Sequence, residues 1–235
     1  KALTWGLEVV ITDTDALVLR EPFSFMTKFP EASFLTTSDC LGNTSGSADG
    51  HGLEDHGCLG QAFNIGYMYF KPSALPLVKP WLMAIRRNPR GTWDQATFNT
   101  LARASYHGGG GGSQLQDKRL FSSYAGGVVG GILPLSLFAG GHTHFVSRMA
   151  WRANNAAPYS VHTTFQYGGA PGKRHRLREA MLWHDSEEYY HPIGGVLTYD
   201  ASIPEEMLTV RTPNGHIDLM LHQLRQMRAA LAISH

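Results

Sequence analysis

The chain has 235 residues, of which 43% are hydrophobic, and its 20 Lys and Arg residues against 19 Asp and Glu give a formal net charge of +1. This length and composition favour a globular protein of one domain, or of one domain with appendages. Except for the cluster from Lys173 to Arg178, the basic residues are scattered along the sequence. This distribution argues against a nucleic-acid partner. No apolar run reaches the roughly 18 residues that a membrane span requires.

Two segments have the character of buried strands. Leu7 to Ile11 is a continuous apolar run of the kind that is covered on both faces of a parallel sheet, and Ala62 to Phe70 is rich in aromatic residues. Strands of this kind alternate with helical patterns along the chain. The sequence therefore predicts an α/β fold with a mostly parallel sheet and flanking helices.

Four segments have helical spacing. Residues 74–87 and 94–103 each end near Pro or Gly, and residues 174–183 predict a short basic helix. Residues 215–233 predict a longer helix with one apolar face, which we expect to contact the core or another domain. That face is formed by Ile217, Met220, Leu221, Leu224, Met227 and Leu231.

The segments between these elements include an insertion and a pair of cysteines. Gly108 to Ser113 is a low-complexity, glycine-rich insertion in which we expect no chemistry. Cys40 and Cys58 flank a loop rich in Gly, Ser, Asp and His. They are consistent either with one disulfide in an oxidising compartment or with two free thiols, and their spacing alone does not choose between these.

Two aspartates, Asp13 and Asp15, follow the first predicted strand. Ligands of open α/β sheets bind beyond the carboxyl ends of the strands, so both carboxylates are expected to face one crevice. With Thr14 between them, the two side chains can share a hard divalent cation and leave coordination positions for phosphate oxygens. The alternative is that these residues only form a turn or cap at the end of a strand.

Two classes of enzyme place carboxylates in this way. In haloacid-dehalogenase-like phosphatases the first Asp is a nucleophile and the second a general acid, but Leu17 stands where that motif usually has Thr or Val. The acidic pairs available for magnesium, Glu187-Glu188 and Glu205-Glu206, do not follow apolar strands. The other class is the metal-dependent sugar-nucleotide transferases, in which the two carboxylates hold a metal against a diphosphate.

Motifs further along the chain favour the transferases. In order, they are "DTDALVLREP", "TSD" at Thr37 to Asp39, "FNIGYMYFKP", "WDQATFN" and "VHTTFQYGGAPGKRHRLREAMLW". From about Val9 to Tyr190, the chain resembles the nucleotide-diphospho-sugar transferases of plants and algae. Within that family it is most similar to the arabinosyltransferases that act on hydroxyproline-rich wall glycoproteins such as extensins.

The resemblance implies a GT-A-like fold with a metal site. Asp13 and Asp15 would hold manganese, with magnesium as the alternative, and His162 in "SVHTTF" would be the third protein ligand. Lys173 follows at a spacing that lets its ammonium group reach the same diphosphate.

Other basic residues near this motif are expected to be structural. We expect His142 and His144 to be ordinary structural histidines. Arg174, His175 and Arg176 are expected to form a solvated helix face, although one of them could assist the leaving group.

The resemblance also assigns residues around the donor sugar. Asn64 and Gly66 would border the sugar, with a bulge in an edge strand as the alternative explanation of the glycine. Asp94 and Gln95 would be the catalytic pair that faces the reacting side of the sugar, with helix capping by Asp94 as the alternative. Trp93 is equally consistent with packing.

The function implied is a retaining, manganese-dependent glycosyltransferase. It would move L-arabinofuranose from a UDP-sugar to a hydroxyproline-linked glycan of a secreted or cell-wall glycoprotein, with xylose and galactose still open as donors. Retention requires either that Asp94 attacks as a nucleophile or that the acceptor enters on the leaving-group face, and the sequence leaves both open. A phosphatase and a non-catalytic lumenal scaffold are the alternatives.

The expected domain organisation is a partial GT-A-like domain over residues 1–200 and a helical extension over residues 201–235. A GT-A domain normally opens with a nucleoside-binding unit before the two aspartates, and we expect that unit to lie outside this sequence or on another polypeptide. We expect the protein in the Golgi lumen, anchored as a type II membrane protein by a segment that is not in this sequence.

Overall fold

The computed structural model describes residues 1–41, 52–54, 56–104, 114–115, 119–149, 157–196, 198, 200, 202–209 and 211–233, so the Gly108 to Ser113 insertion lies outside the described residues. The chain divides into two compact units, Lys1–Leu182 and Trp183–His235. Every residue predicted for the site lies in the first unit. The division into a domain over residues 1–200 and an extension over residues 201–235 stays a prediction, and the compact units separate earlier than that.

The strands and helices follow one another along both units. The strands are β1 Val9–Thr12, β2 Ala16–Val18, β3 Phe34–Ser38, β4 Phe63–Phe70, β5 Gln114–Leu115, β6 Leu120–Ser123, β7 Val128–Ile132, β8 Phe138–Gly140 and β9 Ser160–His162. The α-helices are α1 Phe23–Met26, α2 Leu75–Arg87, α3 Asp94–Ala102, α5 Gly169–Glu179, α6 Glu187–Tyr190, α7 Glu205–Thr209 and α8 Pro213–Ile233. Short helical turns occur at Leu3–Trp5, His56–Gly60, Pro72–Ala74 and His142–Val146.

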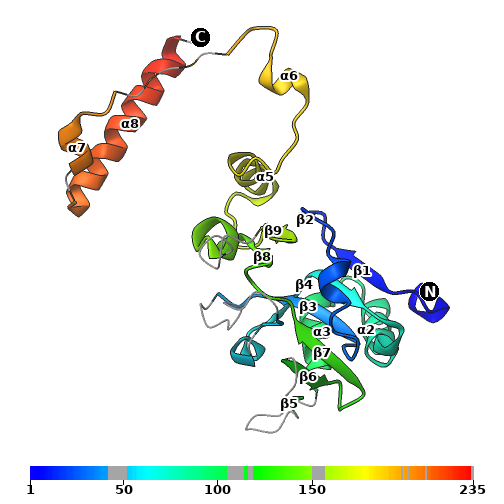
Figure 1. Ribbon diagram of the computed structural model, residues 1–235. Helices are drawn as coiled ribbons and strands as arrows, with labels where there is room; N and C mark the ends of the chain where they lie inside the picture. Colours follow the sequence, from blue (N-terminus) through cyan, green and yellow to red (C-terminus); the bar gives the residue numbers. More distant parts are fainter. Residues whose placement is uncertain are drawn as a thin grey trace. The chain divides into compact units, whose positions relative to one another are not determined.

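The larger sheet has six strands in the order β1-β4-β3-β7-β6-β5 (Figure 1). Among its described strands, β3 and β7 run parallel, and the remaining neighbours are antiparallel. The mixed α/β fold with flanking helices is confirmed, but the expectation of a mostly parallel sheet is wrong. An apolar run reports that a strand is covered on both faces, and it carries no information about the direction of the neighbouring strand.

A second, three-stranded sheet has the order β2-β9-β8. Strand β2 runs antiparallel to β9, and β9 runs parallel to β8. This small sheet matters for the site because it holds the segment that follows Asp15 against the segment that ends at His162.

The first predicted strand is not the buried central strand that its apolar run suggested. Among the described strands, β1 pairs only with β4, which makes it an edge strand of the larger sheet. Val9 and Val10 are half-buried, and Ile11 is exposed. Hydrophobicity alone does not distinguish an edge strand from a central one, because the strand's neighbours lie far away in the sequence.

Hydrophobic side chains cover both faces of the larger sheet. On one face Phe34 of β3 and Phe98 of α3 meet edge to face, with ring centroids 5.6 Å apart, and Leu77 of α2 joins the same cluster. On the other face Leu35 packs in a cluster with Phe138. Burying one such side chain contributes about 1.5–3 kcal/mol, so these two layers hold the sheet and α3 in fixed positions.

Strand β4 contains an irregularity in its pairing with β3. Thr36 pairs with Met68, but the next residue, Thr37, pairs with Asn64. Three residues of β4 are therefore left without partners on β3, and the hydroxyl groups of Thr36 and Thr37 donate to the carbonyl oxygen of Asn64 at 2.9 and 3.0 Å. The bulge considered for this segment is present, but in a strand that lies between β1 and β3 and not at an edge.

The predicted helices occur with one change of bounds. Helices α2, α3 and α8 confirm the segments predicted at 74–87, 94–103 and 215–233. Helix α5 spans Gly169–Glu179, so it ends before the predicted residue 183 and also begins earlier than the predicted residue 174. It can do so because Gly168 takes the left-handed conformation at the N-cap, with φ +83°, and because Pro171 lies in the first turn, where a missing N–H costs nothing.

The second compact unit contains α6, α7 and α8. Both acidic pairs, Glu187-Glu188 and Glu205-Glu206, lie in the first turns of α6 and α7, where negative charge is favourable. The apolar residues predicted for one face of α8 are each about half exposed, so their contact with a core or a domain stays a prediction. No helix in the described part of the chain has the length and apolar character to cross a membrane.

Cys40 and Cys58 form a disulfide, with their Cα atoms 5.5 Å apart. The sequence left open either a disulfide or two free thiols, and the structure contains the disulfide. Cys40 lies just after β3, and Cys58 lies in the short helix before β4. The bond therefore ties the end of β3 to the segment that leads into β4.

We predict that the double variant Cys40→Ser, Cys58→Ser lowers the free energy of unfolding by about 2–4 kcal/mol, because the closed loop no longer restricts the unfolded chain. Denaturant unfolding followed by circular dichroism measures the change. In the unaltered protein, both thiols should resist alkylation until a reductant is added. Rapid labelling of both without reductant would contradict the disulfide.

Candidate metal and nucleotide-sugar site

The two aspartates lie at the point where the chain passes from the larger sheet to the smaller one. The backbone N–H of Asp13 still donates to the carbonyl of Gly66 in β4, at 2.9 Å. The N–H of Ala16 then donates to the carbonyl of Asp13 at 3.1 Å, which closes a tight turn before β2. Beyond the turn, the carbonyl of Asp15 accepts from the N–H of Thr163, just after β9, at 3.1 Å, so the backbone of each aspartate is held by a different sheet.

His162 reaches the same place from β9. His162 pairs with Ala16 in the smaller sheet and is buried. Its Nε2 atom lies 3.6 Å from Oδ2 of Asp13 and 3.4 Å from Oδ1 of Asp15. The ligand atoms of the three residues all lie within 4.8 Å of one another, so one ion could contact all three.

This set of ligand atoms suits a divalent transition metal. Two carboxylates and one imidazole nitrogen combine the oxygen ligands that Mg²⁺ and Mn²⁺ accept with a nitrogen ligand that Mg²⁺ rarely takes. The side chain of Asp13 is 53% exposed, whereas that of His162 is only 9% exposed. The site is therefore anchored on its buried histidine and open to solvent, and to a further ligand, on the side of Asp13.

The second oxygen of Asp15 has its own partners. Nζ of Lys173, in α5, lies 2.5 Å from Oδ2 of Asp15, and the hydroxyl of Thr163 donates to the same oxygen at 3.1 Å. Burial raises the pKa of Asp15, but the hydrogen bond from Lys173, the nearby positive charge and the bond from Thr163 outweigh it and lower the pKa below its usual value. Asp15 is thus an anion with Oδ1 turned toward His162.

His162 is electrostatically prepared to be a ligand. Burial lowers its pKa below that of an exposed histidine, although Asp15 and Asp13 act in the opposite direction. The ring is therefore neutral at pH 7, which is the form that binds metals. Its contacts with the two carboxylates are then those of a neutral ring and not ion pairs.

Asn64 and Gly66 in β4 contact His162 directly. Oδ1 of Asn64 accepts a hydrogen bond from the N–H of Gly66 at 2.8 Å and lies 3.1 Å from Nδ1 of His162. A Cβ atom built on Gly66 would lie 2.0 Å from Cε1 of His162. Gly66 therefore leaves the space that the imidazole ring occupies, a requirement that the sequence analysis did not foresee.

Gln95 is joined to this group through one further residue. Helix α3 is fastened to β4 by Asn99, whose side chain accepts from the N–H of Phe63 and donates to its carbonyl, both at 2.8 Å. One turn earlier in α3, Nε2 of Gln95 donates to Oδ2 of Asp39 at 3.0 Å. Asp39 in turn accepts from Nδ2 of Asn64 at 2.7 Å.

Asp94 is placed differently from Gln95. It is the first residue of α3, after Trp93 at the N-cap, and it is exposed. Its carboxylate accepts a hydrogen bond from the N–H of Gln95 at 2.8 Å, and its carbonyl accepts one from the indole of Trp81 at 3.0 Å. The structure thus brings Gln95 into the hydrogen-bonded group around His162 and leaves the side chain of Asp94 at the helix terminus.

The comparisons with known proteins agree with this geometry. The family described as nucleotide-diphospho-sugar transferase matches residues 1–177. The chain belongs to that family. The mixed α/β sheet with flanking helices is consistent with its GT-A-like fold. No solved structure gives a significant match.

One curated relative is the protein named "Arabinosyltransferase XEG113" from Arabidopsis thaliana. The two sequences are 39% identical over 236 residues, a match that covers 99% of this chain and 35% of the relative. The chain therefore spans about a third of the length of that relative. Membership of the family also leaves the phosphatase alternative without support.

Sequence reasoning missed two residues of the site. Asp39 was noted only as the end of the "TSD" motif, and Thr163 was not singled out. Asp39 follows β3 directly and binds both Asn64 and Gln95. A carboxylate immediately after a buried strand is the same signal that drew attention to Asp13, and it could have identified Asp39 as well.

The structural roles expected for the other histidines and arginines of this region stay predictions. His142 and His144 belong to the helical turn His142–Val146, and burial lowers the pKa of His144. On α5, Arg176 pairs with Glu179 at 2.8 Å on an exposed face, and His175 lies 3.5 Å from the same glutamate.

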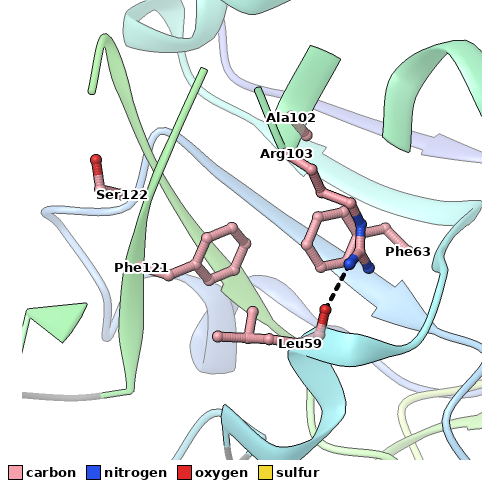
Figure 2. A pocket seen from close by; sticks show the side chains of 6 residues that line it. All are labelled: Leu59, Phe63, Ala102, Arg103, Phe121 and Ser122. Atoms are coloured by element: carbon pink, nitrogen blue, oxygen red, sulfur yellow. Dashed lines mark hydrogen bonds between the residues drawn. The ribbon is translucent and has the colours of Figure 1, made fainter. Parts of the chain in front are cut away.

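A small cavity in the described part of the first unit lies away from this site. It has a volume of about 10 Å³ and is lined by Leu59, Phe63, Ala102, Arg103, Phe121 and Ser122 (Figure 2). The guanidinium of Arg103 lies over the ring of Phe63, 4.2 Å from its centroid, and donates to the carbonyl of Leu59 at 2.6 Å. A volume of this size holds about one water molecule, so it belongs to the packing of β4 and not to a substrate site.

We predict that Gly66→Ala weakens Mn²⁺ binding at least about tenfold, because the added methyl group displaces the ring of His162, whose Nε2 faces both carboxylates. Electron paramagnetic resonance of free Mn²⁺ measures the affinity without any substrate. Gly60→Ala is the matched control, since a Cβ atom there meets nothing within 4 Å. Equal affinities of the two variants would contradict this role of Gly66.

Proposed function

We propose that this chain carries the metal and donor site of a retaining glycosyltransferase that uses a UDP-sugar. The observation that supports the proposal most directly is the convergence of Asp13, Asp15 and His162 on one point, with Lys173 bound to the second oxygen of Asp15. Family membership supports a sugar-nucleotide donor. The arrangement combines a cation site with a basic side chain, as binding of a diphosphate requires.

The metal ligands are Asp13, Oδ1 of Asp15 and Nε2 of His162, and the preferred metal is Mn²⁺, with Mg²⁺ as the alternative. When bound, the metal would act as a Lewis acid and reduce the negative charge that develops on the departing diphosphate. Asp15 orients its Oδ1 because Lys173 and Thr163 hold its Oδ2. The open side of the group, next to Asp13, is where phosphate oxygens would enter.

Lys173 and the start of α5 form the second part of the diphosphate site. Lys173 lies in the early part of α5, which begins at Gly169. The N-terminal N–H groups of a helix favour a bound anion, and a lysine beside them adds a full positive charge. The tight turn into α5 requires glycine at position 172, because a Cβ atom there would lie 1.8 Å from the carbonyl oxygen of Tyr167.

The donor sugar would lie near Asn64 and Gln95, with Asp94 at its reacting face. The support for this placement is the connection of Gln95 to Asn64 through Asp39. For retention of configuration, either Asp94 attacks the sugar or the acceptor approaches on the face from which the diphosphate departs. The exposed position of Asp94 is compatible with both.

We further propose L-arabinofuranose as the sugar and a hydroxyproline-linked glycan of a secreted protein as the acceptor. The support is the similarity to a protein named as an arabinosyltransferase. A Golgi location, with the protein anchored by a segment that is not in this sequence, goes with such an acceptor, and the Cys40–Cys58 disulfide is compatible with an oxidising lumen.

We predict that Asp13→Asn lowers Mn²⁺-dependent binding of UDP by roughly a hundredfold or more, because a direct metal ligand contributes at least as much as the outer partners, which contribute 10- to 100-fold. The melting temperature should change little, since the side chain of Asp13 is half exposed and its backbone bond to Gly66 remains. Titration calorimetry with and without Mn²⁺ measures the effect. Asp218→Asn, on the exposed surface of α8, is the control for loss of one carboxylate.

An unchanged UDP affinity in Asp13→Asn would remove the metal role. If the unaltered protein bound neither Mn²⁺ nor UDP, the scaffold alternative would be favoured. Turnover of an aryl phosphate with Mg²⁺ and a covalent phosphate on Asp13 would instead support a phosphatase.

We predict that Asp94→Asn in the complete protein lowers kcat about a hundredfold or more with little change in donor KM. A group at the reacting face strengthens its interaction as positive charge develops on the sugar, so its loss affects the rate more than binding. The assay uses UDP-arabinofuranose and a hydroxyproline arabinoside. Capping alone predicts an almost unchanged rate, because Asn serves a helix N-terminus nearly as well as Asp, and a product of inverted configuration would refute retention.

A further inference from the structure

A continuous chain of side-chain hydrogen bonds runs from α3 to His162. Nε2 of Gln95 donates to Oδ2 of Asp39 at 3.0 Å, and Nδ2 of Asn64 donates to Oδ1 of Asp39 at 2.7 Å. Oδ1 of Asn64 lies 3.1 Å from Nδ1 of His162. The four residues come from α3, the position after β3, β4 and β9, so the chain of bonds joins four separate segments.

The direction of every bond in this chain follows from Asp39. An ionised carboxylate only accepts hydrogen bonds, so the amide group of Asn64 must turn its NH₂ toward Asp39. The carbonyl oxygen of Asn64 then faces His162 and the N–H of Gly66, which donates to it at 2.8 Å. An amide oxygen also only accepts, and it lies 3.1 Å from Nδ1, whereas the carboxylates of Asp15 and Asp13 lie farther from Nε2, at 3.4 and 3.6 Å. The shorter contact favours the hydrogen of the neutral ring on Nδ1.

The consequence appears on the other side of the ring. With the hydrogen on Nδ1, the lone pair is on Nε2, and Nε2 is the atom that faces Asp13 and Asp15 at 3.6 and 3.4 Å. If the amide of Asn64 turned over, its NH₂ would face Nδ1, and the hydrogen of the ring would move to Nε2. A metal could then no longer accept electrons from that atom.

We propose that Asp39 is a positioning residue, which acts through Asn64 to hold His162 in the tautomer whose Nε2 lone pair points into the site. This inference rests on the proposed metal role of Asp13, Asp15 and His162. The same carboxylate binds Gln95, so it also sets the position of Gln95 relative to the metal ligands.

Asp39 is itself firmly held. Its backbone N–H donates to the carbonyl of Ala62 at 2.9 Å, and its chain neighbour Cys40 is bonded to Cys58. The N–H of Cys40 also donates to the hydroxyl of Ser38 at 3.1 Å. A carboxylate fixed on both sides of its backbone can orient an amide more effectively than one on a free loop, because little motion remains to be lost.

The test uses the whole chain, labelled with ¹⁵N in its histidines and free of metal, at a pH above 7 at which His162 is neutral. Long-range ¹H–¹⁵N correlation spectra report which ring nitrogen carries the hydrogen. In the unaltered protein we expect the hydrogen of His162 on Nδ1. In Asp39→Ala we expect a mixture of the two tautomers, and Mn²⁺ affinity, measured by electron paramagnetic resonance, should fall about 10- to 100-fold.

An exchange of the two side chains distinguishes positioning from general stability. In the double variant Asp39→Asn, Asn64→Asp, the amide now at position 39 can accept from Gln95 and donate to the carboxylate now at position 64, which accepts from Gly66 and His162. We expect this double variant to restore the Nδ1 tautomer and most of the Mn²⁺ affinity. Glu8→Gln removes one carboxylate that binds Tyr69, outside this chain of bonds, and should change neither readout.

The possible outcomes separate this inference from the proposed function. An unchanged tautomer and affinity in Asp39→Ala would overturn the positioning role. If the tautomer shifts as expected but the unaltered protein binds no Mn²⁺, the orientation by Asp39 holds and the metal function fails. Where Asp39→Ala does not fold, Asp39→Ser takes its place, since its single, shorter hydroxyl cannot hold the amides of both Asn64 and Gln95 and should shift the same two readouts.

Discussion

The site depends on the backbone pairing that holds both ends of the turn from Asp13 to Asp15. Asp13 is bonded to β4 of the larger sheet, and the residue after Asp15 pairs with His162 in the smaller sheet. Two like charges placed this close repel each other, so a flexible loop would separate them. Strand pairing keeps them together, and one cluster that contains Leu35 of β3 and Phe138 of β8 packs the two sheets against each other.

The charges of the group explain why this pairing produces a cation site. Asp13 and Asp15 carry two negative charges, Lys173 carries one positive charge, and His162 is neutral because burial lowers its pKa. The group therefore keeps an excess of negative charge in a partly buried place. A divalent cation removes that excess, and a diphosphate on the exposed side would balance the cation in turn.

Local sequence patterns predicted the helices and strands that depend on neighbouring residues, but they did not predict contacts between residues distant in the sequence. Helices α2 and α3 and strand β4 were predicted because periodicity and aromatic content are local. The edge position of β1 and the antiparallel pairing of the sheet depend on partners far along the chain. The position of Asp39 after a strand is a local signal, but its partners Asn64 and Gln95, which give it a role, are 25 and 56 residues away. The resemblance to a known family predicted Asp13, Asp15 and His162 as one set of metal ligands, and in the structure their ligand atoms lie within 4.8 Å of one another.

The bulge in β4 connects the core to the site. Phe63 and Ile65 pack with the same cluster as Met68 and Phe70, although regular alternation would place these two pairs on opposite faces of the strand. The three residues unpaired with β3 reverse the alternation, and the hydroxyls of Thr36 and Thr37 hold the carbonyl that the bulge exposes. Asn64 and Gly66, two residues apart, share the opposite face of β4, which contacts His162, and the bulge returns Met68 and Phe70 to the buried face of Phe63. The position of the histidine is thus determined by the same strand that forms the core.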